Sequence, residues 1–169
     1  MKIRVCSLAR LHETVEETRA RHVVTLVRDE ARVFRPNGIA PDDHLWLQMD
    51  DISEPLDGMI LPCEEHVQKL VGFLDRWDRA QPLVVHCFAG ISRSTAAAYV
   101  AACALSPQRD EEEIALRLRA ASPTASPNIR LVAMGDAFLG RQGRMLKAIG
   151  RIGYGLAAYE AEPFTLPVD

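Results

Sequence analysis

Residues 83–98 read LVVHCFAGISRSTAAA, and this stretch decides the fold. Its first three residues are aliphatic, and two are β-branched, which is the composition of a buried strand. From Ser92 the sequence turns to small, helix-forming residues and predicts a helix. The loop from Cys87 to Arg93 therefore joins a strand to a helix N-terminus. Backbone N–H groups converge in such a loop and attract an anion.

The side chains of this loop are suited to chemistry on that anion. Only a thiolate is an effective nucleophile, and both the helix N-terminus and the cationic Arg93 favour the thiolate form of Cys87. Arg93 also offers a planar fork of donors that matches two oxygens of a phosphate group. Ser94 can hydrogen-bond the thiolate, and Gly90 permits backbone conformations that wrap an anion. The alternative, a buried core cysteine before a helix-capping serine, leaves Gly90 and Arg93 unexplained.

Residues 86–94, HCFAGISRS, resemble the H-C-x5-R-S/T signature of the cysteine-dependent protein tyrosine phosphatases. Gly90 and the Ser-Arg-Ser ending are similar to the dual-specificity branch, in a small single-domain member of the prokaryotic type. The resemblance covers about residues 3–139 and is firm at the loop. It implies catalytic roles for His86, Cys87, Arg93 and Ser94. It also implies that the substrate phosphate is bound by Phe88, Ala89, Gly90, Ile91, Ser92 and Arg93.

The same resemblance implies hydrolysis of a phosphate monoester through a cysteinyl-phosphate, with no metal and no other cofactor. An acid must protonate the leaving oxygen from a loop beside the thiolate. Aligning residues 45–49, LWLQM, with the family's strand places this acid on Asp51. Asp50 and Asp57 remain alternatives, although Asp57 precedes Gly58 in a strong turn signal.

The variable loop positions Phe88, Ala89 and Ile91 contain no Lys or Arg. Relatives that act on multiply phosphorylated lipids or inositols tend to place basic residues there. The resemblance therefore implies a phosphorylated protein or peptide as the partner, through phosphotyrosine and also through phosphoserine or phosphothreonine. Two other classes stay open: a phosphate-binding scaffold with poor turnover, and a sulfurtransferase or arsenate reductase-like thiol enzyme. Against the latter, Cys87 lies mid-chain and no Asp-Pro dipeptide follows it.

The composition of the chain limits the number of domains, the class of partner and the compartment that can be expected. A chain of 169 residues is long enough for one domain, and a net charge of −3 without a basic tract gives no reason to expect nucleic acid. No apolar run approaches the ~20 residues of a membrane-spanning helix, so no membrane insertion is expected. The N-terminus does not resemble a signal peptide. Four cysteines without a C-x-x-C pair fit a reducing cytoplasm, and the scattered histidines predict no metal site. The sequence leaves the oligomeric state open.

Hydrophobic patterning predicts strands and helices in alternation. Strands are expected at 3–8, 22–27, 44–49 and from 83, and helices at 11–19, 62–79, 92–105, 110–121 and 126–139. This alternation predicts an α/β domain with a mostly parallel, four- to five-stranded sheet and helices on both faces. Asp110 is expected to cap one helix with Glu113 at the reciprocal position, and Ser126 to cap another.

The last thirty residues have a different character. Five glycines punctuate them, and Arg141, Arg144, Lys147 and Arg151 occur with no acid among them. We expect a single domain over 1–169, with a core at about 3–139 and a basic helical extension at 140–169 that ends in an extended stretch from Pro163. The basic helix is interpreted as a solvated face docked on the domain rather than as a contact for an anionic surface.

Overall fold

The structure is a computed structural model that describes residues 1–168, and it confirms the predicted α/β class. Five strands form one sheet in the order β3-β2-β4-β1-β5, and every neighbouring pair is parallel except β1 with β5. The strands are β1 Lys2–Ser7, β2 His22–Thr25, β3 His44–Trp46, β4 Leu83–Cys87 and β5 Phe164–Pro167. The helices are α1 Leu11–Thr18, α2 Glu64–Arg76, α3 Arg93–Leu105, α4 Glu111–Ala121, α5 Ile129–Phe138 and α6 Arg144–Ile152, with short 3-10 turns at Glu30–Arg32 and Pro41–Asp43.

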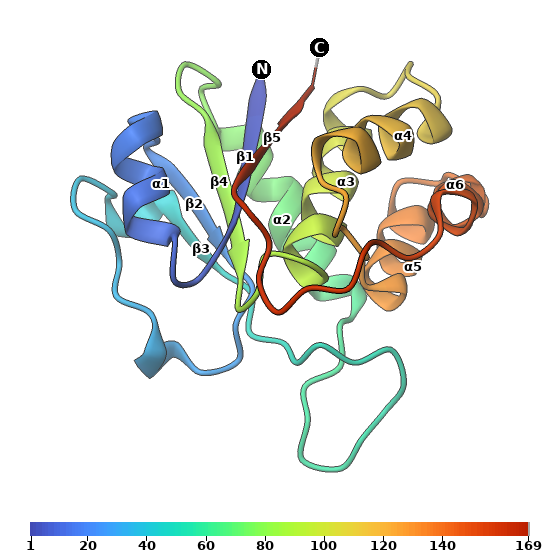
Figure 1. The fold of residues 1–169 in the computed structure, drawn as a ribbon, viewed down its shortest axis with the longest axis horizontal. Coiled ribbons are helices and arrows are strands. Elements are labelled where there is room, and N and C mark those ends of the chain that lie inside the picture. The colour runs from blue at the N-terminus through green and yellow to red at the C-terminus, as the bar shows by residue number, and fades with distance from the viewer. Residues whose placement is uncertain (169) are drawn as a thin grey trace.

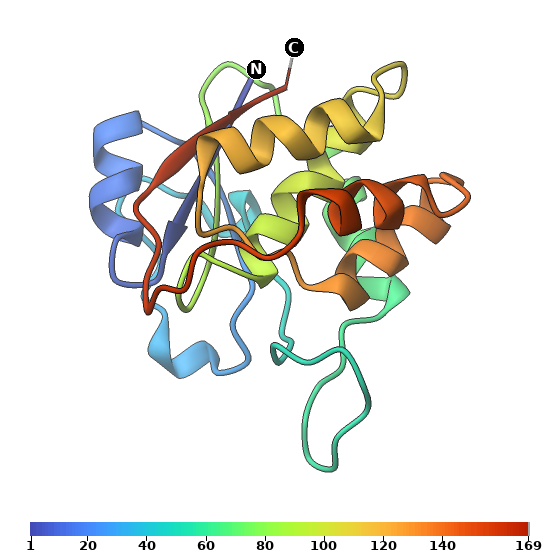
Figure 2. The same ribbon diagram turned by 45° about the vertical axis from the view of Figure 1, so that its right-hand side comes forward.

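The two faces of the sheet are covered unequally, with α1 on one side and α2 to α6 on the other (Figures 1 and 2). Each face has its own apolar core, because side chains alternate between the faces along each strand. The larger core lies under the five helices and includes Val85 and Cys87, whereas Val84 belongs to the smaller core under α1. All five residues of β4 are buried, which is typical of a central strand in a parallel sheet.

Helix α3 lies at the centre of the larger core, as its small residues predict. Its alanines from Ala96 to Ala102 are all at most 1% exposed. Gly135 of α5 allows that helix to approach α3 closely, because a Cβ added at Gly135 would lie 2.5 Å from a methyl group of Val100 in α3. Helix α3, which follows the loop after β4, is therefore packed closely against α5.

Several boundaries differ from the predictions by a few residues, and two of the differences have a clear local reason. Strand β3 ends at Trp46 rather than at residue 49, because its neighbour β2 already ends at Thr25. Helix α5 is capped by Asn128 and not by Ser126: the Asn128 Oδ1 accepts a hydrogen bond from the N–H of Leu131 at 3.0 Å. Ser126 Oγ instead accepts from the N–H of Gly155 at 2.9 Å.

The cap at Asp110 is confirmed, since its carboxylate accepts from the N–H groups of Glu112 and Glu113. The reciprocal half of the expected capping box was wrong. The Glu113 carboxylate instead accepts from the guanidinium groups of Arg109 and Arg117, at 3.3 and 2.7 Å.

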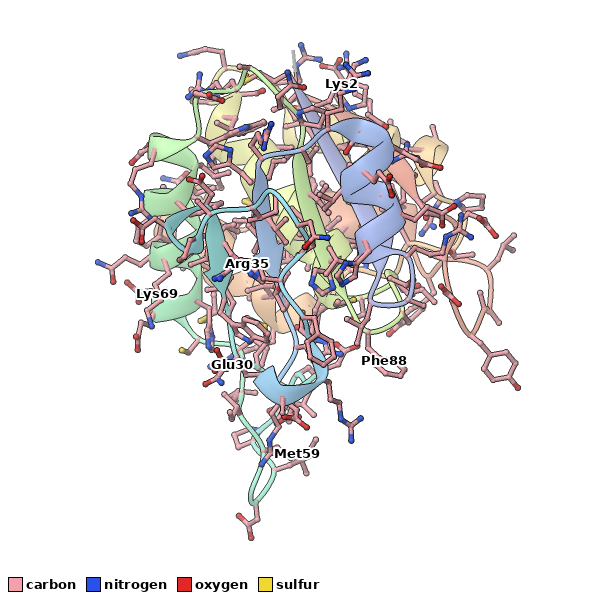
Figure 3. All side chains as sticks on the ribbon, turned by 90° about the vertical axis from the view of Figure 1, so that its left-hand side faces the viewer. Lys2, Glu30, Arg35, Met59, Lys69 and Phe88 are labelled. Carbon is pink, nitrogen blue, oxygen red and sulfur yellow. The ribbon has the colours of Figure 1, made fainter. Side chains whose placement is uncertain are left out.

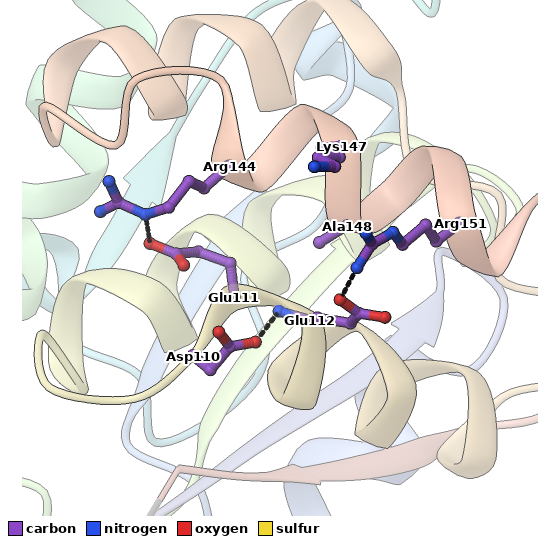
Figure 4. Close-up of a pocket in the computed structure, with 7 residues that line it drawn as sticks. All are labelled: Asp110, Glu111, Glu112, Arg144, Lys147, Ala148 and Arg151. Atoms are coloured by element: carbon purple, nitrogen blue, oxygen red, sulfur yellow. Dashed lines mark hydrogen bonds and ion pairs between the residues drawn. The ribbon is translucent and has the colours of Figure 1, made fainter.

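The segment after residue 139 is part of the packed domain. Strand β5 pairs antiparallel with β1, and Met145, Ala148 and Leu166 belong to the larger core. The basic residues meet the acidic first turn of α4, where Arg144 pairs with Glu111 and Arg151 pairs with Glu112 (Figure 4). Buried Glu111 also pairs with the buried Arg141 at 2.9 Å. Basic residues of the segment 140–169 and the acidic first turn of α4 therefore form ion pairs with one another.

Candidate active site

The loop between β4 and α3 is held by hydrogen bonds to its outward-facing carbonyl groups. The carbonyl oxygens of Phe88, Ala89, Ile91 and Ser92 each accept a backbone N–H. In that order the donors are Leu8, Ala161, Ser126 and Asn128, at 3.1, 2.9, 3.0 and 3.2 Å. These donors lie after β1, before β5 and on both sides of Pro127, so distant parts of the chain fix one short loop.

The N–H groups of the same loop remain unbonded. Within residues 1–168, no backbone N–H from 88 to 92 donates a hydrogen bond. Because N–H and C=O point in opposite directions from a peptide unit, outward carbonyls turn the N–H groups toward the centre of the loop. Converging free N–H groups at a helix N-terminus form an anion-binding nest.

Gly90 is required at its position for two reasons. Its φ of +74° lies in the left-handed region, which side chains with a Cβ rarely adopt. A Cβ there would also lie 3.0 Å from the backbone of both Cys6 and Ser7. The loop is thus folded tightly against the end of β1.

Cys87 and Arg93 lie at the two ends of this nest. The Cys87 Sγ is 3.1 Å from Ser94 Oγ, in a position to accept its hydrogen bond as a thiolate. The Arg93 Nη1 donates to the carbonyl of Met49 at 2.9 Å, which fixes the guanidinium against the segment that follows β3. Its Nε is buried and has no hydrogen-bond partner among the described residues. A fixed guanidinium with a free donor is suited to an oxyanion.

His86 is buried directly before Cys87. Its Nε2 lies 2.7 Å from the hydroxyl of Thr25, and that hydroxyl is also 2.7 Å from the Nε2 of His44. Burial lowers the pKa of His86 to about 3, and burial together with Arg35 lowers the pKa of His44 to about 4. Both imidazoles are therefore neutral at physiological pH.

The hydrogen bonds of the three candidate acids distinguish them from one another. Asp51 Oδ1 accepts from Ser92 Oγ at 2.7 Å and from Asn128 Nδ2 at 2.8 Å, which brings the carboxyl to the rim of the nest. Its Oδ2 accepts no hydrogen bond within residues 1–168. Asp50 instead closes a loop, since its Oδ2 accepts from the N–H of Ile60 at 2.7 Å and from Arg28 at 3.3 Å.

Asp57 lies in the exposed turn of the loop that connects β3 to α2. This loop projects away from the body of the molecule (Figure 1). Of the three carboxyl groups, Asp51 alone is hydrogen-bonded to a residue of the nest within the described part of the chain.

An open cleft of about 650 Å³ lies beside Arg93. Its walls include Val27, Gln48 and Phe88, whose side chain is 59% exposed. Phe88 and Glu30, both cleft residues, lie at the same end of the molecule (Figure 3). Two of the cleft's arginines are already paired, Arg28 with Asp50 and Arg32 with Asp29.

Comparison with solved structures places this site in a known architecture. The chain superposes on the Cydia pomonella PTP-2 phosphatase with a TM-score of 0.61 at 18% identity, covering 95% of this chain and 91% of that one. The chain has the fold of the tyrosine and dual-specificity phosphatases. Phosphatase-fold neighbours also include DUSP15 (TM-score 0.62, 18% identity, 88% and 91% covered) and PTPMT1 in complex with PI(5)P (0.58, 19%, 88% and 93%). No protein-family model matches the sequence, and no curated protein is detectably similar to it.

Two contacts between side chains of the site were not predicted from the sequence. The first is the bond from Asn128 to Asp51, for which the only signal was the Ser-Pro-Asn sequence before α5. The second is the contact of Thr25 with both His86 and His44, for which the sequence carries no signal. Within residues 1–168, no group of three or more His, Cys, Asp or Glu side chains could hold a metal ion, and no helix is long and apolar enough to cross a membrane.

Proposed function

We propose that the protein hydrolyses phosphate monoesters through a cysteinyl-phosphate intermediate, as a protein tyrosine phosphatase that also accepts phosphoserine or phosphothreonine. The observation that carries this proposal is the nest itself. Its carbonyls are bonded outward, its N–H groups are free, and Cys87 and the free Nε of Arg93 lie at its two ends. A phosphoryl group bound there meets donors for its oxygens and a nucleophile for its phosphorus.

In the first step the Cys87 thiolate attacks phosphorus, and an S–P bond forms as the P–O bond to the leaving group breaks. The loop N–H groups and Arg93 hold the non-bridging oxygens, so the developing charge is stabilised without rearrangement. The leaving oxygen takes the proton of the Asp51 carboxyl, whose Oδ2 is not engaged by the protein.

In the second step water attacks phosphorus and the S–P bond breaks. The Asp51 carboxylate accepts a proton from this water and returns to its acid form. The departing sulfur is a thiolate again, and the Ser94 hydroxyl at 3.1 Å can donate a hydrogen bond to it. The catalyst is restored, and inorganic phosphate is the second product.

The cleft favours an aryl monophosphate. Phe88 presents an exposed ring beside Arg93, against which a phenyl group can stack. Arg28 and Arg32 each pair with a neighbouring carboxylate, so a second phosphate on the same molecule would have to compete with Asp50 and Asp29 for them. We therefore propose phosphotyrosine on a protein or peptide as the preferred substrate. The thiolate chemistry also requires a reducing compartment, for which we propose the cytoplasm.

The decisive experiment compares two cysteine variants on an aryl phosphate. Cys87→Ser should abolish hydrolysis but still bind tungstate, because the nest and Arg93 hold the anion and only the thiolate forms the intermediate. Cys63→Ser is the matched control, since Cys63 is a half-buried helix cap that serine can replace. Retained turnover in Cys87→Ser would exclude the mechanism. Tungstate binding without turnover in the wild-type protein would instead indicate a phosphate-binding scaffold.

The general acid is tested with leaving groups of different basicity. Asp51→Asn should slow phosphotyrosine hydrolysis by the ~10²–10⁴-fold typical of acid catalysis, with a much smaller loss on an ester of a strongly acidic phenol. Asp50→Asn is the control, because Asp50 closes the loop to Ile60. If the two variants exchange these patterns, the acid is Asp50 and the rest of the mechanism stands.

A further inference from the structure

A second pocket lies between the start of α5 and the end of α6, two helices that run side by side (Figures 1 and 2). Its volume is about 200 Å³. Ile129 of α5, Ile149 and Gly150 of α6, and Gly153 and Tyr154 beyond α6 line it. An apolar cavity of about 150 Å³ is large enough to bind benzene, so the α5–α6 pocket has room for an aromatic ring.

The apolar side chains around this pocket are incompletely packed. The side chain of Tyr154 is 96% exposed and that of Ile129 is 46% exposed, whereas Ile149 is buried. A Cβ added at Gly150 would meet no neighbouring atom within 4 Å, so the α6 side of the pocket is open as well. A planar ring in the pocket would therefore gain contact with the Tyr154 ring, for which an offset or edge-to-face arrangement is favourable.

The end of α6 adds a hydrogen-bond acceptor to this pocket. Helix α6 ends at Ile152, and the N–H of Gly153 donates to the carbonyl of Ile149 at 3.2 Å. Within residues 1–168 no group donates to the carbonyl of Gly150. The last carbonyls of a helix point beyond its end and carry partial negative charge, which favours a donor there.

The charges near the pocket indicate that this donor is neutral. The guanidinium of Arg119 already donates to the carbonyls of Gly153 and Pro123, at 2.8 and 2.9 Å. Arg151 follows Gly150 directly, and no Asp or Glu is among the described residues that line the pocket. A cationic ligand would be repelled by the two arginines, whereas the N–H of an indole or the O–H of a phenol would not.

One wall of the pocket also holds the nest. Ser126 lines the pocket, and its N–H donates to the carbonyl of Ile91 in the nest at 3.0 Å. The hydroxyl oxygen of Ser126 accepts from the N–H of Gly155, just beyond Tyr154, at 2.9 Å. A molecule in the pocket would therefore contact a residue that is bonded both to the nest and to the segment after α6.

We propose that the α5–α6 pocket binds a small neutral aromatic molecule with one hydrogen-bond donor, of the phenol or indole class, and that its occupation tightens anion binding in the nest. The ring lies against Tyr154 and Ile129, and its donor reaches the carbonyl of Gly150. A bound ring restrains Ser126, so the nest loses less freedom when an anion binds. This second part rests on the anion site of the proposed function, whereas binding of the aromatic molecule does not.

Binding is tested with indole in an NMR titration of ¹⁵N-labelled protein. We expect saturable shifts of the amide signals of Gly150, Gly153 and Tyr154. Gly150→Leu should abolish them by filling the pocket, and this variant should fold because leucine is a better helix former than glycine. Gly72→Leu is the matched control, since a Cβ at the exposed Gly72 of α2 also meets no neighbouring atom within 4 Å. Unchanged indole binding in Gly150→Leu would overturn the proposal, as would wild-type shifts confined to other surfaces.

Two further comparisons test the contacts of the ring. Tyr154→Ala should weaken indole binding about fivefold by removing the stacking partner. Tyr159→Ala, which removes a fully exposed ring outside the pocket, should leave binding unchanged. 1-Methylindole has no N–H and should bind the wild-type protein about fivefold more weakly than indole. Equal affinity for the two indoles would show that the Gly150 carbonyl is not the acceptor and that the proposed ligand class is wrong.

The link to the nest is measured by calorimetry with tungstate. Saturating indole should lower the Kd for tungstate about fivefold in the wild-type protein and in Gly72→Leu, but not in Gly150→Leu. An unchanged Kd for tungstate in the presence of bound indole would overturn the coupling. Absence of tungstate binding with and without indole would instead count against the proposed function, and the NMR titration would still decide whether the aromatic site exists.

Discussion

Acid should destabilise this protein through His86 in particular. Burial lowers the pKa of His86 from 6.5 to about 3, so the unfolded chain takes up a proton at a pH where the folded protein does not. The stability contribution is complete above about pH 6.5 and is lost as the pH falls toward 3. At pH 5 the linkage relation gives a loss of about 2 kcal/mol relative to pH 7.5 from this one group.

The measurement is urea unfolding at pH 7.5 and pH 5.0 for the wild-type protein, His86→Gln and His12→Gln. The pKa values of His44 and His66 are also lowered by burial, so the wild-type loss should exceed the His86 share. The His86→Gln variant should lose about 2 kcal/mol less between the two pH values than the wild-type protein does. His12 is exposed, and its variant should behave as the wild type. Equal losses in wild type and His86→Gln would refute the reasoning.

Four further substitutions test how the site and the α4–α6 contact are built. Gly90→Ala should cost about 1–3 kcal/mol in urea unfolding, because φ is positive and β1 is in contact, and calorimetry should detect no tungstate binding. Asn128→Ala should cost about 1 kcal/mol through the lost cap and slow phosphotyrosine hydrolysis more than hydrolysis of an activated ester, because the acid loses its tether. Glu111→Ala should cost about 3–5 kcal/mol by leaving Arg141 buried and unpaired, whereas Glu113→Ala on the exposed side should cost under about 1 kcal/mol.

The loop between β4 and α3 could be predicted because it depends on residues that are neighbours in the sequence. The strand, the loop and the helix follow one another in the sequence, so spacing alone places Cys87 at a helix N-terminus near Arg93. The parallel sheet follows from the alternation of strands and helices for the same reason. The cap at Asp110 could also be predicted from the sequence, because a helix cap bonds N–H groups only two or three residues away.

What holds the loop could not be read from the sequence, because those partners are distant. No residue near Ala89 indicates that its carbonyl accepts a hydrogen bond from the N–H of Ala161. The apolar residues at the end of the chain likewise do not indicate that they form β5 and pair with β1. Ser126 and Asn128 are both good caps, and tertiary contacts decide between them, since Gly155 occupies the serine hydroxyl. Alternation places Thr25 on a face of the sheet but does not reveal that two histidines meet its hydroxyl.

The bond from Ala161 to Ala89 has a consequence for biosynthesis. The donor is translated about 70 residues after the carbonyl it binds, which at ~5–20 residues per second corresponds to several seconds. Early in that interval only the anchor at Leu8 has been translated, and after Asn128 is made the loop still lacks the bond from Ala161. Over the same interval β1 has an open edge where β5 will pair. The thiol is therefore exposed to oxidants before the anion site is complete. We therefore expect oxidation of Cys87 to threaten the chain more during its synthesis than after the fold is complete.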